Sequence, residues 1–368
     1  MKLPNIRTAG AVALLAATIL SLSACGGDDA EDQGSVPSSV YAVTPLVVDA
    51  NANGLNAPVQ DPHLINPWGI AFNPTGFVWV TNNGNATSTL YDGKGTAQSL
   101  VVTTPAAPTG IVFYGGTNFV VSGTNAAGAA VTGPSRFIFA TEGGQIAAWA
   151  PAVTPTSTTI MFDGSAARKS YKGLATATQG TTTFLYATDF RNAKVDVFDS
   201  SFKPVSPGGS FTDPSVPAGY APFGIQTIGT RIFVTYAKQN ADASDRVNGR
   251  GLGAVSVYDL TGVLVMSFAN GGALNSPWGL TQAPANFGAY SNAILVGNFG
   301  DGMINAYDAT TGKYLGALRN ATGSVVQIDG LWGLAFGNDR SDQPSNALFA
   351  TAGAVGEKHG TYNRVDAK

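Results

Sequence analysis

The sequence predicts an all-β protein, a six-bladed β-propeller, from two observations. First, a short pattern recurs six times: an apolar residue, an aromatic residue or Leu, Ala or Val, then Thr or Gly. The copies are Val78–Thr81, Ile138–Thr141, Leu185–Thr188, Ile232–Thr235, Ile294–Gly297 and Leu348–Thr351. Second, each copy follows an apolar run led by Gly and precedes a third run that ends near an aromatic residue. Three runs repeated six times, with a further edge run, are typical of propeller blades.

Glycine opens the first run of every unit. The six residues are Gly69, Gly110, Gly173, Gly224, Gly279 and Gly333. We expect these runs to be the innermost strands, because six backbones converge near the axis and Gly permits the closest approach. Their mean spacing exceeds the ~40–50 residues usual for a four-stranded blade, so long loops are also expected.

The third runs alternate in polarity, which predicts half-buried strands. An example is Asp196–Asp199, and several of these runs end in Asp before a turn. We expect Asp92, Asp259 and Asp308 to accept a hydrogen bond from their own backbone two residues later. Their expected role is therefore to shape turns, and not catalysis.

The last unit contains only three runs and ends at Thr361–Val365. One spare apolar run, Tyr41–Val48, precedes the first unit. We therefore expect this N-terminal strand to close the last blade as its outer edge strand, where Pro45 is tolerated. The propeller domain is expected to span residues 41–368.

Residues 1–24 are expected to be a lipoprotein signal peptide. Lys2 and Arg7 give a positive start, and the apolar stretch Ala9–Leu20 is too short to span a bilayer. Leu22-Ser23-Ala24-Cys25 resembles the bacterial lipobox, in which the Cys is lipidated, and Cys25 is the only cysteine of the chain. The alternative is an ordinary secretory signal. With one cysteine, no disulfide can form within the chain.

Residues 25–40 are rich in Gly, Ser and acidic residues and predict a flexible acidic tether. The expected location is therefore exported and anchored to a membrane by a lipid at Cys25. Because Gly26 follows the Cys in place of an inner-membrane retention Asp, the outer membrane is favoured over the inner.

The charge of the chain argues against a nucleic-acid partner. Lys and Arg number 20 against 23 Asp and Glu, and the formal net charge is −3. Charged residues are 12% of the chain, about half the usual share, and they form no basic stripe.

Polar residues recur directly after the second strands, on what we expect to be the ligand face. They are Asn82, Glu142, Asp189, Tyr236 and Asn298. The amides and carboxylates of Asn82, Glu142, Asp189 and Asn298 could hold Ca²⁺ or another divalent cation near the axis, since such ions prefer oxygen ligands. The alternative is that these groups bond neighbouring turns, which we favour.

The residues that enter the first strands form a second set on this face. They include Trp68, Lys172, Phe223, Trp278 and Trp332. The aromatic members could form a stacking surface for a sugar or aromatic ligand. We favour the alternative that they wedge between blades as core.

Two loops on the expected ligand face depart from the repeat. Lys238–Gly251 follows the fourth unit's second strand and adds Asp242, Asp245, Arg246 and Arg250, and Gly356–Gly360 adds an ionisable cluster near the C-terminus. His359 lies beside Glu357 and is a candidate general base. No Gly-x-Ser-x-Gly elbow, zinc-type His pair or nucleotide-binding Gly loop occurs in the sequence.

Three segments carry a resemblance to a known family. Asn66–Phe72, Ser88–Gly93 and Phe137–Glu142 resemble an uncharacterised family of exported bacterial propeller proteins, often found in genomes with the PEP-CTERM sorting system and distantly similar to NHL-repeat propellers. The resemblance covers roughly residues 41–360 and implies the fold without an established activity. A weaker similarity leads to gluconolactonase-like enzymes, which hold a divalent cation on the axis. Their ligand types match Glu142, Asn82, Asn298 and Asp189.

Two functions follow from the sequence. The leading hypothesis is a membrane-anchored, exported propeller that binds a ligand or partner of unknown specificity, because the fold signals lack an accompanying catalytic set. The alternative is a divalent-metal-dependent lactonase or esterase with its site on the propeller axis.

Overall fold

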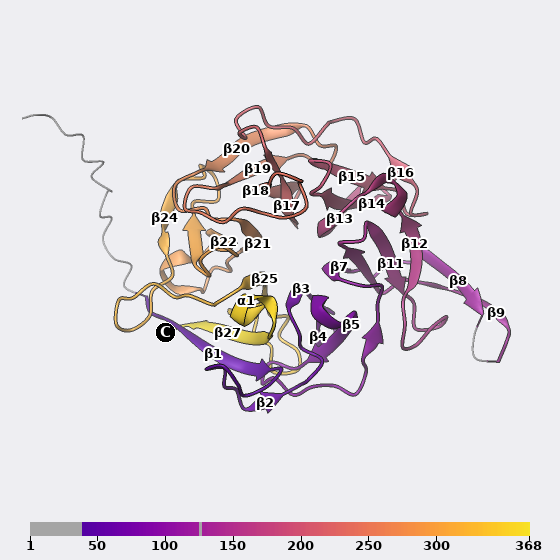
Figure 1. Ribbon diagram of the computed structural model, residues 1–368, viewed down its shortest axis with the longest axis horizontal. Helices are drawn as coiled ribbons and strands as arrows, with labels where there is room; N and C mark the ends of the chain where they lie inside the picture. Colours follow the sequence, from indigo (N-terminus) through magenta and orange to yellow (C-terminus); the bar gives the residue numbers. More distant parts are fainter. Residues whose placement is uncertain (1–38, 125–126) are drawn as a thin grey trace, which may run out of the picture. The chain divides into compact units, whose positions relative to one another are not determined.

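The structure, a computed structural model, describes residues 39–124 and 127–368. Six sheets of mainly antiparallel strands are set around a central axis, and a two-stranded hairpin makes a seventh (Figure 1). Within this part of the chain the only α-helix is α1 (Ala354–Glu357). The predicted six-bladed β-propeller is therefore confirmed. Cys25, the expected signal peptide and nearly all of the expected tether lie outside the described residues.

Each blade contains four main strands, ordered from the axis outward. The innermost strands are β3 (Pro67–Phe72), β7 (Pro108–Phe113), β13 (Tyr171–Gln179), β17 (Tyr220–Ile228), β21 (Pro277–Gln282) and β25 (Leu331–Phe336). The second strands are β4 (Val78–Asn82), β10 (Phe137–Thr141), β14 (Thr182–Asp189), β18 (Arg231–Lys238), β22 (Ile294–Asn298) and β26 (Ala347–Ala352). The third strands are β5 (Thr87–Tyr91), β11 (Gln145–Trp149), β15 (Lys194–Phe198), β19 (Gly253–Tyr258), β23 (Ile304–Tyr307) and β27 (Thr361–Ala367). The outer strands are β6 (Val102–Thr103), β12 (Thr159–Asp163), β16 (Pro204–Val205), β20 (Leu264–Asn270), β24 (Tyr314–Ala317) and β1 (Tyr41–Val48).

The six glycines of the first runs let adjacent inner strands touch. A Cβ atom at Gly69 would lie 2.5 Å from the backbone oxygen of Thr109 in the next blade. A Cβ at Gly224 would collide with the backbone oxygen of Trp278, and the same relation returns at Gly333, which abuts the backbone of Trp68. The expected close approach at the axis is thus present around the ring.

The Thr of the repeated pattern fastens one blade to the next. The backbone N–H of Gly173 donates to Thr188 Oγ1 at 2.7 Å, and Thr188 Oγ1 donates to the carbonyl of Phe223 in the following blade at 2.8 Å. Thr81 makes the same pair of bonds at 2.7 Å each, and Thr351 makes them at 2.9 and 2.6 Å. One hydroxyl therefore satisfies two buried backbone groups that the bulged inner strand leaves without a strand partner.

The N-terminal strand closes the ring as predicted. β1 pairs antiparallel with β27 from Tyr41↔Ala367 to Val48↔Thr361, and the short β2 (Val59–Gln60) pairs in parallel with the end of β1. The buried Tyr41 ring stacks on Tyr290 of the fifth blade with centroids 5.7 Å apart, and its hydroxyl donates to the carbonyl of Phe287. β1 therefore completes the last blade through its pairing with β27, and it connects that blade to the fifth blade through Tyr41.

The prediction that the third strands are half-buried is wrong for most of them. Every residue of β19 and β23 is buried, because each blade packs between two neighbours and both faces are covered. The aspartates that follow do shape their turns: Asp92, Asp259 and Asp308 each accept a backbone N–H from two residues later.

Two insertions account for part of the expected loop length. A hairpin of β8 (Val120–Thr124) and β9 (Ala130–Pro134) projects from the second blade (Figure 1). A long loop also joins β18 to β19 and reaches the axis. In the residues that the structure describes, no helix is long and apolar enough to cross a bilayer.

Candidate functional site

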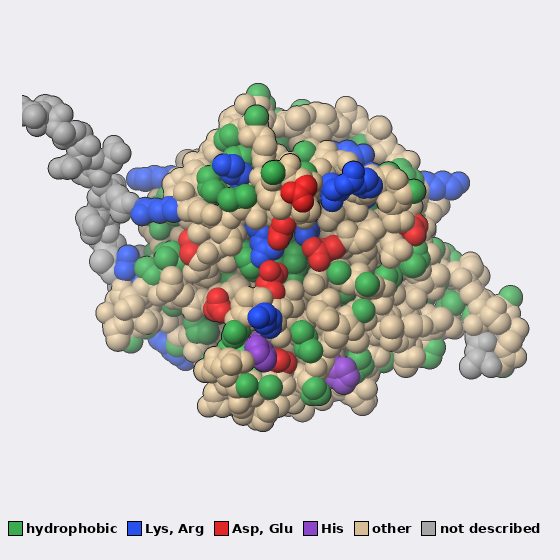
Figure 2. Space-filling model, viewed as in Figure 1, with side chains coloured by type: hydrophobic (Ala, Val, Ile, Leu, Met, Phe, Trp, Pro, Cys, Tyr) green, Lys and Arg blue, Asp and Glu red, His purple; other side chains and the backbone are tan. Residues whose placement is uncertain are grey.

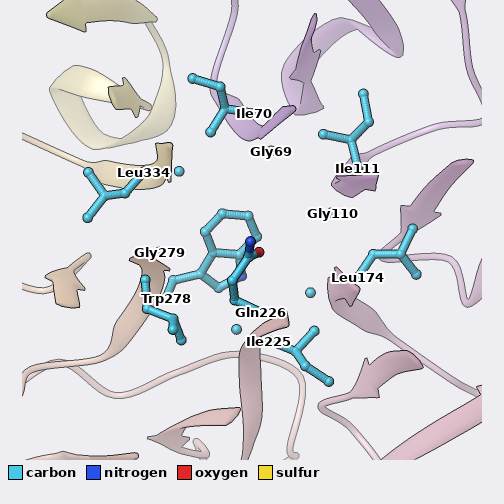
Figure 3. Close-up of a pocket in the computed structure, with 14 residues that line it drawn as sticks. Gly69, Ile70, Gly110, Ile111, Leu174, Ile225, Gln226, Trp278, Gly279 and Leu334 are labelled. Carbon is cyan, nitrogen blue, oxygen red and sulfur yellow. The ribbon is translucent and has the colours of Figure 1, made fainter. Parts of the chain in front are cut away.

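The inner strands surround a narrow channel on the axis. The aliphatic side chains that follow the six glycines line it: Ile70, Ile111, Leu174, Ile225, Leu280 and Leu334. The side chains of Trp278 and Gln226 project into the centre of this channel (Figure 3), which has a volume of about 40 Å³. Such a space holds a few water molecules at most, so the channel itself is too small for an organic ligand.

Aromatic side chains close the channel at one end. The group comprises Trp68, Trp278, Trp332, Phe190, Phe223 and Phe299. Trp68 and Trp332 stack with centroids 3.5 Å apart, and the edge of Trp278 meets both rings. All three tryptophans are buried, as the core interpretation expects, and the indole nitrogens of Trp68 and Trp278 find no acceptor among the described residues.

A buried lysine lies against this aromatic group. The Lys172 ammonium is 5.1 Å from the centroid of Trp68 and forms an ion pair with Glu142 of the second blade. The Lys172 side chain is only 1% exposed, whereas that of Glu142 is 34% exposed. The other Glu142 oxygen accepts from Asn83 Nδ2 at 3.2 Å.

A buried arginine lies over the other side of the group. Arg246 Cζ is 3.8 Å from the centroid of Phe299 and 5.3 Å from that of Trp332. Its guanidinium donates to Asp245 at 2.7 Å and to Glu357 at 2.8 Å. Burial opposes the charge, but the two carboxylates outweigh it and raise the pKa of Arg246 above its ordinary value. The arginine is therefore permanently charged in this position.

The loop between β18 and β19 holds Arg246 in place. Arg246 forms a β-bridge with Gln239, and the backbone of Val247 bonds that of Lys238 at 2.8 Å. Further along, Gly249 donates its N–H to Asn275 of the fifth blade at 2.7 Å. An otherwise irregular loop is thus anchored at both sides of the arginine.

We call the six aromatic residues together with Lys172, Arg246, Glu142, Asp245 and Glu357 the axial cluster. Within the axial cluster, the basic side chains are more deeply buried than the acidic ones. The basic side chains are 1% and 8% exposed, whereas Glu142, Glu357 and Asp245 are 34%, 28% and 47% exposed. Charged side chains gather at the centre of the face shown in Figure 2. A molecule approaching the axial cluster from solvent therefore meets carboxylates first.

The segment that carries Glu357 is strained. Val355 has φ 54° and Glu357 has φ 65°, both in the left-handed region that disfavours residues with a Cβ. Asp329 fastens the segment by accepting the Val355 N–H at 2.8 Å. Each such residue costs on the order of 1 kcal/mol, and strain of this kind persists where the surroundings impose it, often at functional sites.

The four residues expected to share a cation have separate partners. Asn82 donates to Thr87 and Thr89, Asp189 accepts from Ser170 and Asn192, and Asn298 bonds Asn275 and Ala273, each within its own blade. Glu142 is paired with Lys172. Across residues 39–124 and 127–368, no group of three or more His, Cys, Asp or Glu side chains is placed to hold a metal ion. The four side chains are thus each bonded within their own part of the ring, and the buried Asn82 Oδ1 has no hydrogen-bond partner among the described residues.

Two further sequence candidates have structural roles. The Tyr236 hydroxyl bonds that of Tyr258 at 2.5 Å inside the core between blades, where burial raises the pKa of Tyr236. His359 does not act with Glu357: its Nδ1 bonds Asp49 at 2.7 Å and its Nε2 bonds Asn53 at 2.8 Å. Because both ring nitrogens are engaged, His359 joins the end of β1 to the C-terminal loop and is not placed as a general base.

Two members of the axial cluster, Phe190 and Phe299, are not among the residues predicted from the sequence. Arg246 and Asp245 are expected on this face as part of the Lys238–Gly251 loop, but no sequence pattern predicts their contacts with Phe299 and Glu357. Phe190 and Phe299 had a usable signal, since each directly follows a polar residue already singled out, Asp189 and Asn298. The position directly after these polar residues therefore predicts both aromatic side chains.

Comparison with known proteins gives relatives without an assigned role. No protein-family model matches the chain. It is 34% identical over 288 residues to "Uncharacterized protein R648" of Acanthamoeba polyphaga mimivirus, covering 75% of this chain and 69% of that protein. A second mimivirus protein, "Uncharacterized protein L690", is 33% identical over 288 residues, with coverage of 75% and 74%.

Solved structures resemble the chain in fold. A protein of unknown function from Bacteroides thetaiotaomicron superposes with a TM-score of 0.55 at 11% identity, covering 90% of this chain and 76% of that one. A glucose dehydrogenase superposes with a TM-score of 0.51 at 12% identity, with coverage of 89% and 100%. At such low identities these likenesses support the propeller fold alone.

Proposed function

Since the chain belongs to the family of the two mimivirus proteins, which brings no activity with it, we propose a function from the site itself: a propeller that binds a small ligand at the axial cluster, without chemistry of its own. The observation that carries this proposal is that all six blades contribute to the axial cluster. Glu142 comes from the second blade, Lys172 from the third, Arg246 from the fourth, and the fifth, sixth and first supply Phe299, Trp332 and Trp68.

Energetic cost supports a functional role for the axial cluster. Two cations buried with their carboxylate partners and two unpartnered indole N–H groups are costly to desolvate, and apolar residues of similar volume are often as stable or more stable in such places. Strain at Val355 and Glu357 adds to that cost. Features of this kind collect at binding sites, where the few polar groups of an apolar region fix the orientation of a ligand.

Thermal melts against a compound panel test the proposal. The panel contains millimolar amines, guanidines, neutral sugars, carboxylates and CaCl₂. We expect at least one organic class to raise the melting temperature, by about 5 °C at one hundred times its dissociation constant. The gain should be lost when Glu142 and Glu357 are both changed to Gln and kept in Asp342→Asn, whose carboxylate pairs with the exposed Lys94.

Two outcomes would count against axial binding. One is a panel without any stabilising organic compound, and the other is equal stabilisation of wild type and the double variant Glu142→Gln with Glu357→Gln. We expect CaCl₂ to leave the melting temperature unchanged. A calcium gain that Glu142→Gln removes would instead support the metal-dependent lactonase or esterase.

Location is a separate part of the proposal. We propose that the protein is exported and held at a membrane, preferably the outer one, by a lipid on Cys25, on the strength of the Leu22–Cys25 sequence. Cys25→Ser should abolish incorporation of a labelled fatty acid and leave either uncleaved precursor or a soluble exported form. Fatty-acid label retained by the variant would refute lipidation at this residue.

A further inference from the structure

The surroundings of Arg246 have the composition of a binding site for a planar cation. Phe299 lies 3.8 Å from the guanidinium carbon and Trp332 lies 5.3 Å from it, so aromatic faces cover the cation. Carboxylate oxygens of Asp245 and Glu357 accept from its edge at 2.7 and 2.8 Å. Aromatic faces with carboxylates at the edge are the groups that recognise organic cations in proteins.

We propose that this slot, formed by Phe299, Trp332, Asp245 and Glu357, takes the guanidinium or a similar planar cationic group of an external ligand, and that Arg246 is its internal stand-in. The inference rests on the proposed axial function and narrows it to one ligand class. The backbone beside Arg246 is anchored by its bridge to Gln239, so exchange requires only that the arginine side chain turn out of the slot while Trp332 of β25 and Phe299, directly after β22, stay in place.

The charges at the entrance favour the same class. The three most exposed charged groups of the axial cluster are carboxylates, and the two cations lie beneath them. Exposed carboxylates raise the local concentration of a cation and disfavour an anion. An anionic ligand would first have to displace Glu142 from Lys172 or Glu357 from Arg246.

Whether the Arg246 side chain occupies the slot should therefore set the affinity of the slot for an external cation. A cation that enters the wild-type slot competes with a side chain tethered beside it, which lowers its apparent affinity. Removing the arginine side chain should empty the slot and leave Glu357 and Asp245 without their cation. An added guanidinium compound should then bind more tightly and restore lost stability.

Chemical rescue of Arg246→Ala tests this inference. We expect the variant to melt below wild type, and millimolar ethylguanidinium to raise its melting temperature saturably, with at least tenfold tighter binding than to wild type. Urea, which is planar but neutral, should give no rescue. Arg364→Ala, which removes an arginine paired with Asp366 at 2.7 Å, is the matched control and should show no rescue by ethylguanidinium.

Two further variants test the same proposal, one if Arg246→Ala does not fold and one through the carboxylate of Glu357. If Arg246→Ala does not fold, Arg246→Lys keeps the charge while removing the planar group, and ethylguanidinium should still stabilise it more than it stabilises wild type. Adding Glu357→Gln to Arg246→Ala should weaken the rescue at least tenfold. If ethylguanidinium raised the melting temperatures of the Arg246 and Arg364 variants equally, the proposal that the slot binds a planar cation would be wrong. A different compound class that stabilises wild type through Glu142 would then show that the axial site binds a ligand of another kind.

Discussion

Deleting Tyr41–Val48 should destabilise the propeller by at least about 5 kcal/mol, because a whole ladder and four buried side chains are lost together. Tyr41, Leu46, Val47 and Val48 are 0 to 7% exposed. The deletion also removes the contacts of Tyr41 with Phe287 and Tyr290 of the fifth blade. Domains are stable by only about 5–15 kcal/mol, so a loss of this size removes a large part of the total.

Urea unfolding of the full chain measures this loss. The deletion should lower the urea midpoint strongly or abolish the cooperative transition. Thr44→Ala lies on the same strand with an exposed side chain and should shift the midpoint only slightly. A deleted protein with the wild-type midpoint would show that ring closure by β1 does not hold the last blade in place.

The fold was predictable because its signals are local and repeated. Gly at the inner strand and Thr at the end of the second strand recur in most units, and each has one physical task. Gly173 permits close contact with the next inner strand, and Thr188 bonds that strand's backbone. The role of this Thr could not be predicted from the pattern, because the carbonyl that accepts its hydrogen bond belongs to the following blade, some 35 residues later.

The site was predictable only in part. Lys172, Glu142 and the tryptophans lie in repeat positions, so their shared face could be inferred. Arg246 belongs to an insertion, and its position over Phe299 depends on loop contacts that no periodic pattern encodes. Asp189 lies in the expected repeat position, but only the structure gives its partners: Ser170 and Asn192 of its own blade donate to its carboxylate.

The second large loss of stability is expected when a glycine of the inner strands is replaced. Gly224→Ala places a methyl group where the backbone oxygen of Trp278 lies, with Thr235 Oγ1 2.8 Å away. Backbone cannot rotate aside as a flexible side chain can, so β17 and β21 must separate. Overpacking of this kind costs about 3 kcal/mol, and more if the shift spreads around the closed ring.

Two measurements check the prediction for Gly224→Ala. The urea midpoint should fall, and tryptophan fluorescence should change, since Trp278 belongs both to the contact and to the axial cluster. Gly143→Ala is the matched control: a Cβ there would meet only Thr141 Oγ1 at 3.7 Å, and its φ is not in the left-handed region. Because the same substitution is made at both positions, the intrinsic difference between Gly and Ala largely cancels. Equal stability of the two variants would mean that the inner strands have room to spare at the axis, and that tight convergence is not what selects Gly there.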